Sequence, residues 1–555
     1  MTRTPIATSM IKHSHSLEDE HDSPMNPVSS LSNNDKCTTP GFLIKAVAAA
    51  SLGGILFGYD MGVVSGALPQ LKQNFTLNDA QEETVVSFLY LGCCIGSALG
   101  GTLCDSVGRR KSILLTDIIF VIGAILLWES SSIPQLLIGR IVVGIAVAVS
   151  GIADVAYLHE ISPSIWRGSI ISVNEGCISL GFMLSYLSGY GISMISPNQG
   201  WRYMFGIGAI IAIMQFISMI FMPESPVWLQ ENGFITAAEQ ARNIIKHDTS
   251  PSPTIGTTHS FNGETIEFAS QHSSVLSSDP GSVETDIVYG SVDHKQQQNP
   301  QQQYTPPTPL TTDSLSSILV MYRKQVVITL FLAIIQQFCG HPNVLNFAPE
   351  IFIQIGYTSS KSSLRGTFLI GVVKFIAACI VIVNIERIGR RVLLLLGIGM
   401  ICMGNLFVTL SLWKGSTSLD LTISLWEKVI AVVGIFLVAI GYAVSFGPLT
   451  WLIVSEIFPP SIRGRALGAS LLVTYIALFL VSYTFLSGQK LGKAIPFLCY
   501  FLVTLLSMVF VYLAIPDTGR KSPEEIEGTM TQMRFWKKST RSLNFFTTVP
   551  TTAIV

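Results

Sequence analysis

The stretch Asp105-Ser106-Val107-Gly108-Arg109-Arg110 indicates the fold, because its pattern returns as Glu386-Arg387-Ile388-Gly389-Arg390-Arg391. Each copy has an acidic residue, two further residues, a glycine and a pair of arginines. A signature that occurs once in each half of a chain indicates two related structural units.

Two more signatures occur in the same order in both halves. Glu160-Ile161-Ser162-Pro163, followed by Arg167 and Gly168, returns as Glu456-Ile457-Phe458-Pro459, followed by Arg463 and Gly464. Pro223-Glu224-Ser225 returns as Pro516-Asp517-Thr518. The three pairs together indicate a parallel repeat, with the halves arranged around a central site.

The composition is that of a membrane protein that crosses the bilayer many times. The chain has 555 residues, of which 49% are hydrophobic and 12% are charged, whereas an ordinary soluble domain has about 25% charged residues. The net charge of −1 gives no reason to expect a nucleic-acid partner. Eight of the nine cysteines lie in or beside apolar runs, so we expect free thiols.

Twelve apolar runs are long enough to cross a bilayer as helices. They are Phe42–Leu68, Thr84–Leu103, Ser112–Trp128, Leu136–Leu158, Ser169–Tyr190, Tyr203–Met222, Val326–Phe347, Gly366–Ile385, Val392–Trp413, Val429–Val454, Ala466–Ser487 and Ala494–Ile515. The sequence therefore predicts an all-α membrane protein with twelve transmembrane helices in two six-helix bundles.

The domains follow from these runs. We expect a cytosolic N-terminal tail over 1–41, bundles over 42–222 and 326–515, a cytosolic loop over 223–325 and a cytosolic tail over 516–555. The loop is predicted to be largely disordered, because Pro251–Pro309 is rich in Ser, Thr, Gln and Pro.

The positions of lysine and arginine predict the orientation in the membrane. Arginine-rich short loops lie on the side of the N-terminus, which predicts that both termini face the cytosol. Asn74-Phe75-Thr76 then lies outside, where it matches an N-glycosylation acceptor.

The repeated acids and arginines are predicted to form ion-pair clusters that act as a cytosolic gate between the bundles. The alternative is that they only signal topology. The gate residues are Asp105, Arg109, Arg110, Glu160, Arg167, Glu386, Arg390, Arg391, Glu456 and Arg463.

Asp60 lies inside the first apolar run, within Gly53-Gly54-Ile55-Leu56-Phe57-Gly58-Tyr59-Asp60-Met61-Gly62. A charge at that depth costs at least about 2.5–3.5 kcal/mol, so an intramembrane acid is a functional candidate by default. The glycines beside it allow another helix or a ligand to approach the backbone closely.

These signatures resemble those of the sugar porter family of the major facilitator superfamily, from Phe42 to Ile526 without most of the middle loop. The details are most similar to the third class of animal facilitative glucose transporters, especially members 10 and 12. They are Asn174-Glu175, Gly340-His341-Pro342-Asn343 and Lys374. The resemblance implies the major facilitator fold and alternating-access transport of a hexose, with glucose the first candidate.

The resemblance also implies the residues that contact the sugar, beside helices broken at Gly340 and Pro342 and at Gly447-Pro448. They are Gln336, Gln337, Asn343, Trp451, Glu175 and Ile178, together with Lys374, for which we hypothesise a pairing with Glu175 across the cavity. Asp60 is the candidate for proton coupling, with Arg140 as its partner.

Two alternatives remain: a passive uniporter of hexose, polyol or dehydroascorbate, and a sugar receptor that does not transport. No metal, phosphate-loop or nucleophile pattern occurs, so we expect no enzyme activity, cofactor or metal. The expected partners are a sugar, protons and lipid, in the plasma membrane or endomembrane vesicles. The sequence gives no oligomeric state.

Overall fold

The computed structural model describes residues 41–163, 167–247, 321–357, 359–413, 424–519, 521, 523–533 and 535–536. Most of the N-terminal tail, Cys37, the Pro251–Pro309 segment and the end of the C-terminal tail therefore lie outside the described residues.

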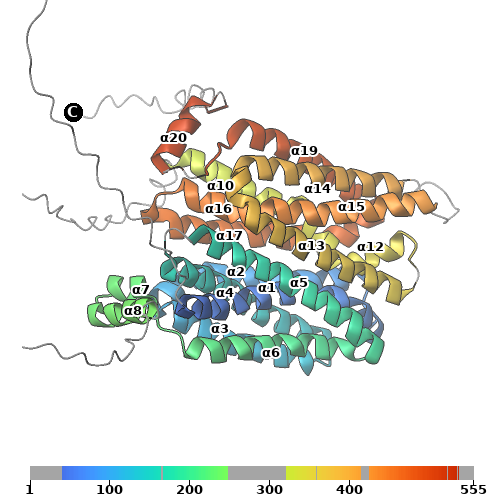
Figure 1. The fold of residues 1–555 in the computed structure, drawn as a ribbon. Coiled ribbons are helices and arrows are strands. Elements are labelled where there is room, and N and C mark those ends of the chain that lie inside the picture. The colour runs from blue at the N-terminus through green and yellow to red at the C-terminus, as the bar shows by residue number, and fades with distance from the viewer. Residues whose placement is uncertain are drawn as a thin grey trace, which may run out of the picture. The chain divides into compact units, whose positions relative to one another are not determined.

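The first group of helices forms the N-terminal bundle, drawn from blue to green in Figure 1. It consists of α1 (Gly41–Phe75), α2 (Asp79–Val107), α3 (Arg109–Trp128), α4 (Ile133–Ile161), α5 (Arg167–Ile195) and α6 (Gly200–Ile220). Two short helices follow it, α7 (Pro226–Glu231) and α8 (Ile235–His247).

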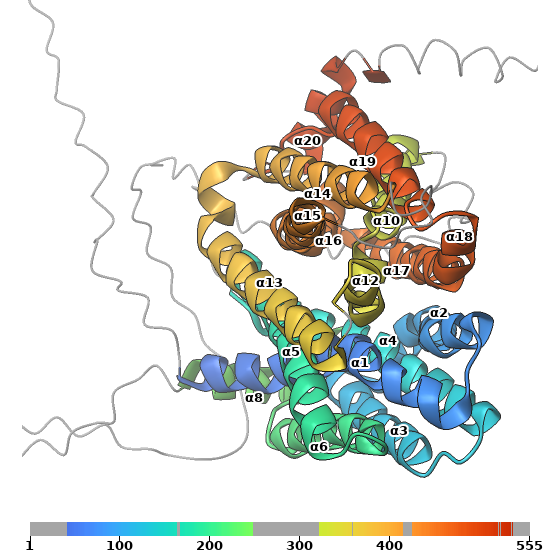
Figure 2. The same cartoon turned by 90° about the vertical axis from the view of Figure 1, so that its right-hand side faces the viewer.

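The second group forms the C-terminal bundle, which Figure 2 shows beside the first. It consists of α10 (Arg323–Phe338), α11 (His341–Asn346), α12 (Ala348–Gln354), α13 (Ser360–Ile388), α14 (Arg390–Trp413), α15 (Leu425–Val444), α16 (Phe446–Ile457), α17 (Pro460–Tyr483), α18 (Phe485–Leu491) and α19 (Ile495–Ala514). The short helix α20 (Pro523–Gln532) follows.

Twelve segments of the described chain are long and apolar enough to span a membrane, as the sequence predicted. Most helices extend beyond their apolar runs, because polar residues continue the helix at the ends. The first helix, for example, reaches Phe75 rather than Leu68. The eight cysteines in the described part of the chain are free, as expected.

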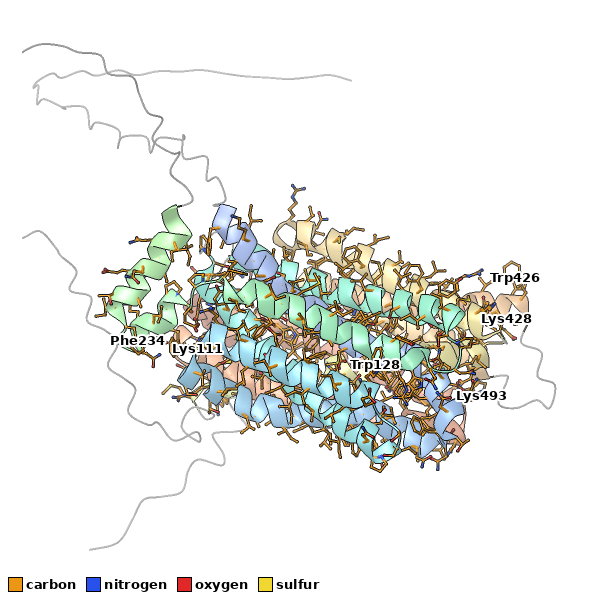
Figure 3. The ribbon with its side chains drawn as sticks, turned by 90° about the horizontal axis from the view of Figure 1, so that it is seen from below. Lys111, Trp128, Phe234, Trp426, Lys428 and Lys493 are labelled. Carbon is orange, nitrogen blue, oxygen red and sulfur yellow. The ribbon has the colours of Figure 1, made fainter. Side chains whose placement is uncertain are left out.

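The helices run between two opposite ends of the molecule. Figure 3 shows Lys111 near one end and Trp426 near the other. We call the end with Arg109 and Arg390 the motif end, and the end with Asn74 and Ser487 the opposite end.

At the motif end the sequence repeat is also a repeat of geometry. Gly108 and Gly389 have φ angles of 104° and 92°, in the region that favours glycine, and each separates two consecutive helices. The arginine after each glycine reaches the matching glutamate: Arg109 Nε lies 3.0 Å from Glu160 Oε1, and Arg390 Nη2 lies 3.5 Å from that of Glu456.

The second arginine of each signature holds the last helix of its own bundle. Arg110 donates to the carbonyls of Met219 and Ile220 at the end of α6, at 3.0 and 2.6 Å. Arg391 donates to the carbonyl of Tyr512 near the end of α19. Arginine at a helix C-terminus satisfies carbonyls that have no partner within the helix.

The glycines of α1 allow it to pack against α5 at backbone distance. A Cβ atom at Gly58 would overlap with the main-chain carbonyl of Ile178, and a Cβ at Gly66 would lie 2.7 Å from Cα of Gly189. Close packing of small residues is a main source of helix association in membranes. This contact fixes the position of Asp60, which lies half a turn beyond Gly58.

At the opposite end, hydrogen bonds join the two bundles. The Glu83 carboxylate of α2 accepts from the main-chain N–H and the hydroxyl of Ser487 in α18, both at 2.7 Å. Asp79 and Lys490 form an exposed ion pair at 3.2 Å beside it. Glu83 is only 2% exposed, so its hydrogen bonds are protected from water.

Replacing Gly58 by alanine should destabilise the protein, because the added methyl group forces α1 and α5 apart. Overpacking of this kind costs about 1–3 kcal/mol. Thermal unfolding in detergent should show a lower melting temperature than the wild type. Gly101→Ala on α2 is the matched control, since nothing lies within 4 Å of its added Cβ. Equal melting temperatures for both variants would contradict the packing argument.

Glu83→Ala should let the bundles separate at the opposite end. Hydrogen bonds to a charged group contribute about 1.5–3 kcal/mol, enough to shift a two-state equilibrium by at least about tenfold. Spin labels at the exposed residues Gln73 and Leu491 should report a larger population of long distances.

Asp79→Asn is the control, because an exposed ion pair contributes little. A distance distribution in Glu83→Ala that matches the wild type would show that Glu83 does not hold the bundles together.

Candidate functional site

Two membrane-spanning segments of the C-terminal bundle are broken near their middle. The chain of the seventh span leaves α10 after Phe338, passes Gly340 with a φ of 87°, and restarts as α11 with Pro342 in its first turn. The tenth span breaks between α15 and α16 at Ser445, just before Gly447-Pro448. Both breaks were predicted from the sequence. Broken helices expose main-chain groups, so ligand sites in membranes form beside them.

The two predicted glutamines lie at the end of α10, buried at 0% and 4% exposure. Gln336 donates from its amide nitrogen to Thr474 of α17 at 3.1 Å, which leaves its side-chain oxygen with no hydrogen-bond partner among the described atoms. That oxygen is an acceptor of the kind that a sugar hydroxyl requires.

Asn343 is mainly a link within its own bundle. Its amide nitrogen donates to the carbonyl of Val481 at 2.8 Å and to the hydroxyl of Tyr500 at 2.7 Å. Its side-chain oxygen has no partner among the described atoms and is the part that remains for a ligand.

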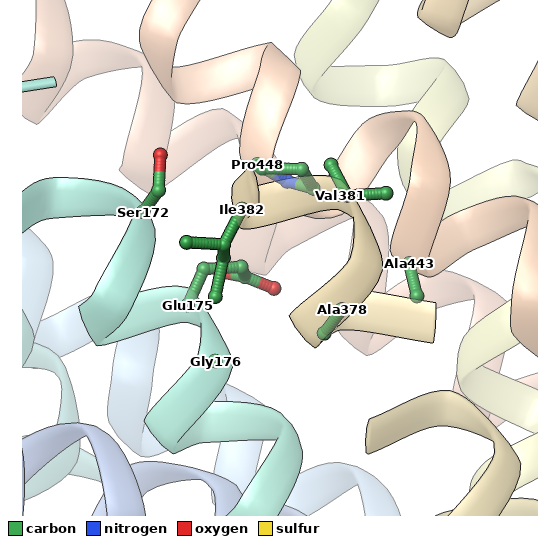
Figure 4. Close-up of a pocket in the computed structure, with 8 residues that line it drawn as sticks. All are labelled: Ser172, Glu175, Gly176, Ala378, Val381, Ile382, Ala443 and Pro448. Carbon is green, nitrogen blue, oxygen red and sulfur yellow. The ribbon is translucent and has the colours of Figure 1, made fainter. Parts of the chain in front are cut away.

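Glu175 of α5 points toward the C-terminal bundle, into a narrow pocket that Figure 4 shows. Residues of both bundles line the pocket, among them Gly176, Ile382, Ala443 and Pro448. A buried water needs roughly 10–15 Å³ of space, and the pocket has less than that. The bundles are therefore closed around this position, and a sugar needs them to move.

Lys374 of α13 is almost completely buried, at 1% exposure. Its ammonium lies 3.8 Å from the ring centre of Phe182 and 5.8 Å from that of Tyr442, so aromatic faces stabilise the charge. Glu175 interacts with it electrostatically. The hypothesised direct ion pair between these two described side chains is absent, because the ammonium is turned toward the rings.

Asp60 and Arg140 lie inside the N-terminal bundle with 4% and 0% exposure. They interact electrostatically without a direct ion pair between the two described side chains. Arg140 donates through Nε to the carbonyl of Val85 at 3.3 Å, while both of its terminal nitrogens have no hydrogen-bond partner within the described part of the chain. The Oδ2 atom of Asp60 also has none among the described atoms. The predicted partners are thus near each other, with bonding capacity unused.

Tyr90 connects this acid–base pair with the broken seventh span. Its hydroxyl accepts from the amide of Asn346 in α11 at 2.6 Å, and the same hydroxyl lies within electrostatic range of Arg140 and Asp60. Sequence reasoning missed Tyr90 and Asn346. A search for polar residues opposite one another in apolar runs of the two halves would have found both.

The remaining predicted residues occupy simpler surroundings. The main chain of Ile178 packs against Gly58, and Trp451 is half-buried on α16. Asn74 is exposed at the opposite end, where its amide nitrogen donates to the carbonyl of Asn198 at 2.5 Å.

The predicted gate residues hold helices of one bundle together in the contacts named above. Asp105 adds to them by lying 3.1 Å from Arg109 on the same bundle. The side chains of Arg167, Glu386 and Arg463 lie outside the described atoms.

Residues 46–529 match the family model described as "Sugar (and other) transporter". The probable metabolite transport protein CsbC of Bacillus subtilis is 33% identical, over 89% of this chain and 95% of the relative. Solute carrier family 2, facilitated glucose transporter member 10 of Danio rerio is 30% identical, over 89% and 93% of the two chains.

Among solved structures, the proton:xylose symporter XylE of E. coli has the same fold, with a TM-score of 0.65 and 24% identity. The alignment covers 89% of this chain and all of that one. A crystal structure of a D-xylose-proton symporter aligns with a TM-score of 0.62 and 25% identity, over 87% and 100% of the two chains.

The family model and the relatives match most of the chain, and the solved structures share its fold. The chain therefore belongs to the family of sugar (and other) transporters and is a multi-pass membrane protein rather than an enzyme.

Proposed function

We propose that this protein carries a hexose across the membrane by alternating access, in symport with protons that bind at Asp60. The observation that carries the proposal is the buried pair of Asp60 and Arg140, which both have side-chain atoms without a hydrogen-bond partner among the described residues. Near this pair, the hydroxyl of Tyr90 is hydrogen-bonded to Asn346 of the broken seventh span. Relatives include a glucose transporter of Staphylococcus epidermidis and an arabinose-proton symporter of Bacillus subtilis, which supports a sugar as the substrate.

The sugar site lies between the bundles. Gln336, Gln337, Asn343 and Trp451 of the C-terminal bundle supply amides and an aromatic face, and Glu175 supplies acceptors from the N-terminal bundle. Ile178 and Lys374 complete the wall. This division of the site suits alternating access, because a ligand held by both bundles stabilises the state in which they close.

Proton coupling follows from the cost of charge in the membrane. When Arg140 is near, its guanidinium stabilises the ionised Asp60; when the helices separate the two, the neutral acid is favoured. Proton uptake at Asp60 and movement of α1 are then linked, so that uptake of sugar rises as the external pH falls.

The orientation is part of the same proposal. The motif end faces the cytosol together with both tails and the loop 223–325, as the arginine distribution favours. Asp105, Arg109, Arg110, Glu160, Arg167 and their counterparts Glu386, Arg390, Arg391, Glu456 and Arg463 then form the cytosolic rims of the two bundles. Asn74 then lies on the side away from the cytosol and is the glycosylation site. The protein resides in the plasma membrane or in endomembrane vesicles.

Asp60→Asn should abolish the dependence of hexose uptake on external pH, because an amide cannot bind or release a proton. Radiolabelled hexose uptake into proteoliposomes, measured across external pH with and without a protonophore, tests this. The wild type should lose uptake when the protonophore removes the proton gradient, and the variant should not respond.

Glu239→Gln on α8 is the control, since Glu239 is exposed and outside the site. If Asp60→Asn keeps the wild-type pH profile, coupling through Asp60 is wrong. If the wild type itself ignores pH and protonophore while still transporting hexose, the protein is a passive uniporter.

Single substitutions Glu175→Lys and Lys374→Glu should each reduce hexose uptake strongly, because each leaves two like charges buried between the bundles. The double variant exchanges the two charges and should recover part of the activity. Uptake of the three variants at equal protein amounts gives the comparison. A double variant no more active than the worse single variant would exclude a functional interaction between the two sites.

A further inference from the structure

A second group of acids lies inside the N-terminal bundle, away from Asp60. Asp117 of α3 and Asp154 of α4 are 1% and 2% exposed, and both lie within membrane-spanning segments. They interact electrostatically with each other. Neither has a role in the sugar site or in the coupling described above.

The hydrogen bonds distinguish the two carboxyl groups. Asp154 accepts from the Ser150 hydroxyl at 2.8 Å and from the Gln215 amide of α6 at 3.1 Å, so both of its oxygens have donors. Both oxygens of Asp117 lack a hydrogen-bond partner among the described atoms, and so does the side-chain oxygen of Gln215. A neutral carboxyl group at Asp117 would leave no ionised oxygen without a hydrogen bond and would add one O–H donor.

Little positive charge is available to offset two ionised acids here. Among the described residues, no lysine or arginine forms an ion pair with Asp117 or Asp154; Arg109, at the start of α3, pairs with Glu160 and Asp105. The neighbouring helices contribute the thiol of Cys104 from α2, the neutral Gln215 from α6 and the bare backbone of Gly53 from α1.

Two carboxylates that interact at such depth do not both ionise at a tolerable cost, because each charge in the hydrocarbon is already expensive and the pair repels. Acids that interact in this way titrate as a unit, so that one of the two holds a proton while the other is ionised.

We propose that Asp117 and Asp154 form a second proton-binding site, in which Asp117 carries one proton and Asp154 is the hydrogen-bonded carboxylate. The site is an intramembrane acid pair, and its ligand is a single proton.

The site is closed on one side by α1. A Cβ atom at Gly53 would overlap with the Asp154 carboxylate and lie 2.6 Å from the Gln215 amide nitrogen, so only a glycine lets α1 lie there. Gly53 precedes Asp60 by about two helical turns. A shift of α1 therefore changes the surroundings of both Asp60 and Asp154. This link to transport rests on the proposed function, whereas the bound proton does not.

Infrared spectroscopy of the full-length protein in proteoliposomes tests the bound proton, since a protonated carboxyl group has its own C=O stretching band that shifts in D2O. At neutral pH the wild type should show such a band. Asp117→Asn should remove the equivalent of one protonated carboxyl group, and Asp60→Asn and the exposed control Glu239→Gln should retain it.

An unchanged band in Asp117→Asn would overturn the proposal. Asp117→Asn is preferred to Asp154→Asn because its carboxyl group has no hydrogen bond to lose, and thermal unfolding checks that it folds. A pH titration of the wild type needs no variant. If the wild type lacks the C=O band at every pH at which it is folded, the proposal is also overturned.

Addition of glucose to Asp60→Asn tests the link through α1. A glucose-induced change in the Asp117 band supports it, and a band that stays constant while glucose binds refutes it. If no hexose binds to the wild type either, the proposed function fails, while the band of the unliganded protein still decides the proton site.

Discussion

The cost of placing charge in a membrane governs this protein. Asp60, Arg140 and Lys374 lie in membrane-spanning helices and are almost completely buried, and Glu175 of α5 is half-buried. A charge there is retained only where a partner, an aromatic face or a proton lowers its energy. Aromatic rings surround Lys374, hydrogen-bond partners surround Asp154, and an opposite charge lies near Asp60.

Close helix packing fixes the position of Asp60. The glycines of α1 bring its backbone against α5. Asp60 lies between two of them, Gly58 and Gly62. A helix that touches its neighbour at backbone distance cannot slide by small amounts, because every displacement meets a carbonyl or a side chain. Movement of α1 is therefore expected between discrete positions rather than by continuous sliding.

Much of the fold could be predicted from the sequence. The lengths of the apolar runs predicted twelve membrane spans. The repeated glycines mark the same helix break at Gly108 and Gly389. Gly340 and Pro342 mark the break in the seventh span. The site was harder, because contacts between distant segments do not follow from local pattern. The bond from Asn346 to Tyr90 and the rings beside Lys374 depend on how bundles pack. Asp117 and Asp154 could have been found by the reasoning that singled out Asp60.

The two arginine signatures at the motif end have one more consequence. In each half the first arginine joins its glutamate and the second holds the end of that half's last helix, and the contacts named for one half do not involve the other. Each half thus has arginine contacts of its own at the motif end, which join helices of that half. Because these contacts lie within each half, they can stay intact while the two bundles move relative to each other, so that each bundle can move as a rigid unit.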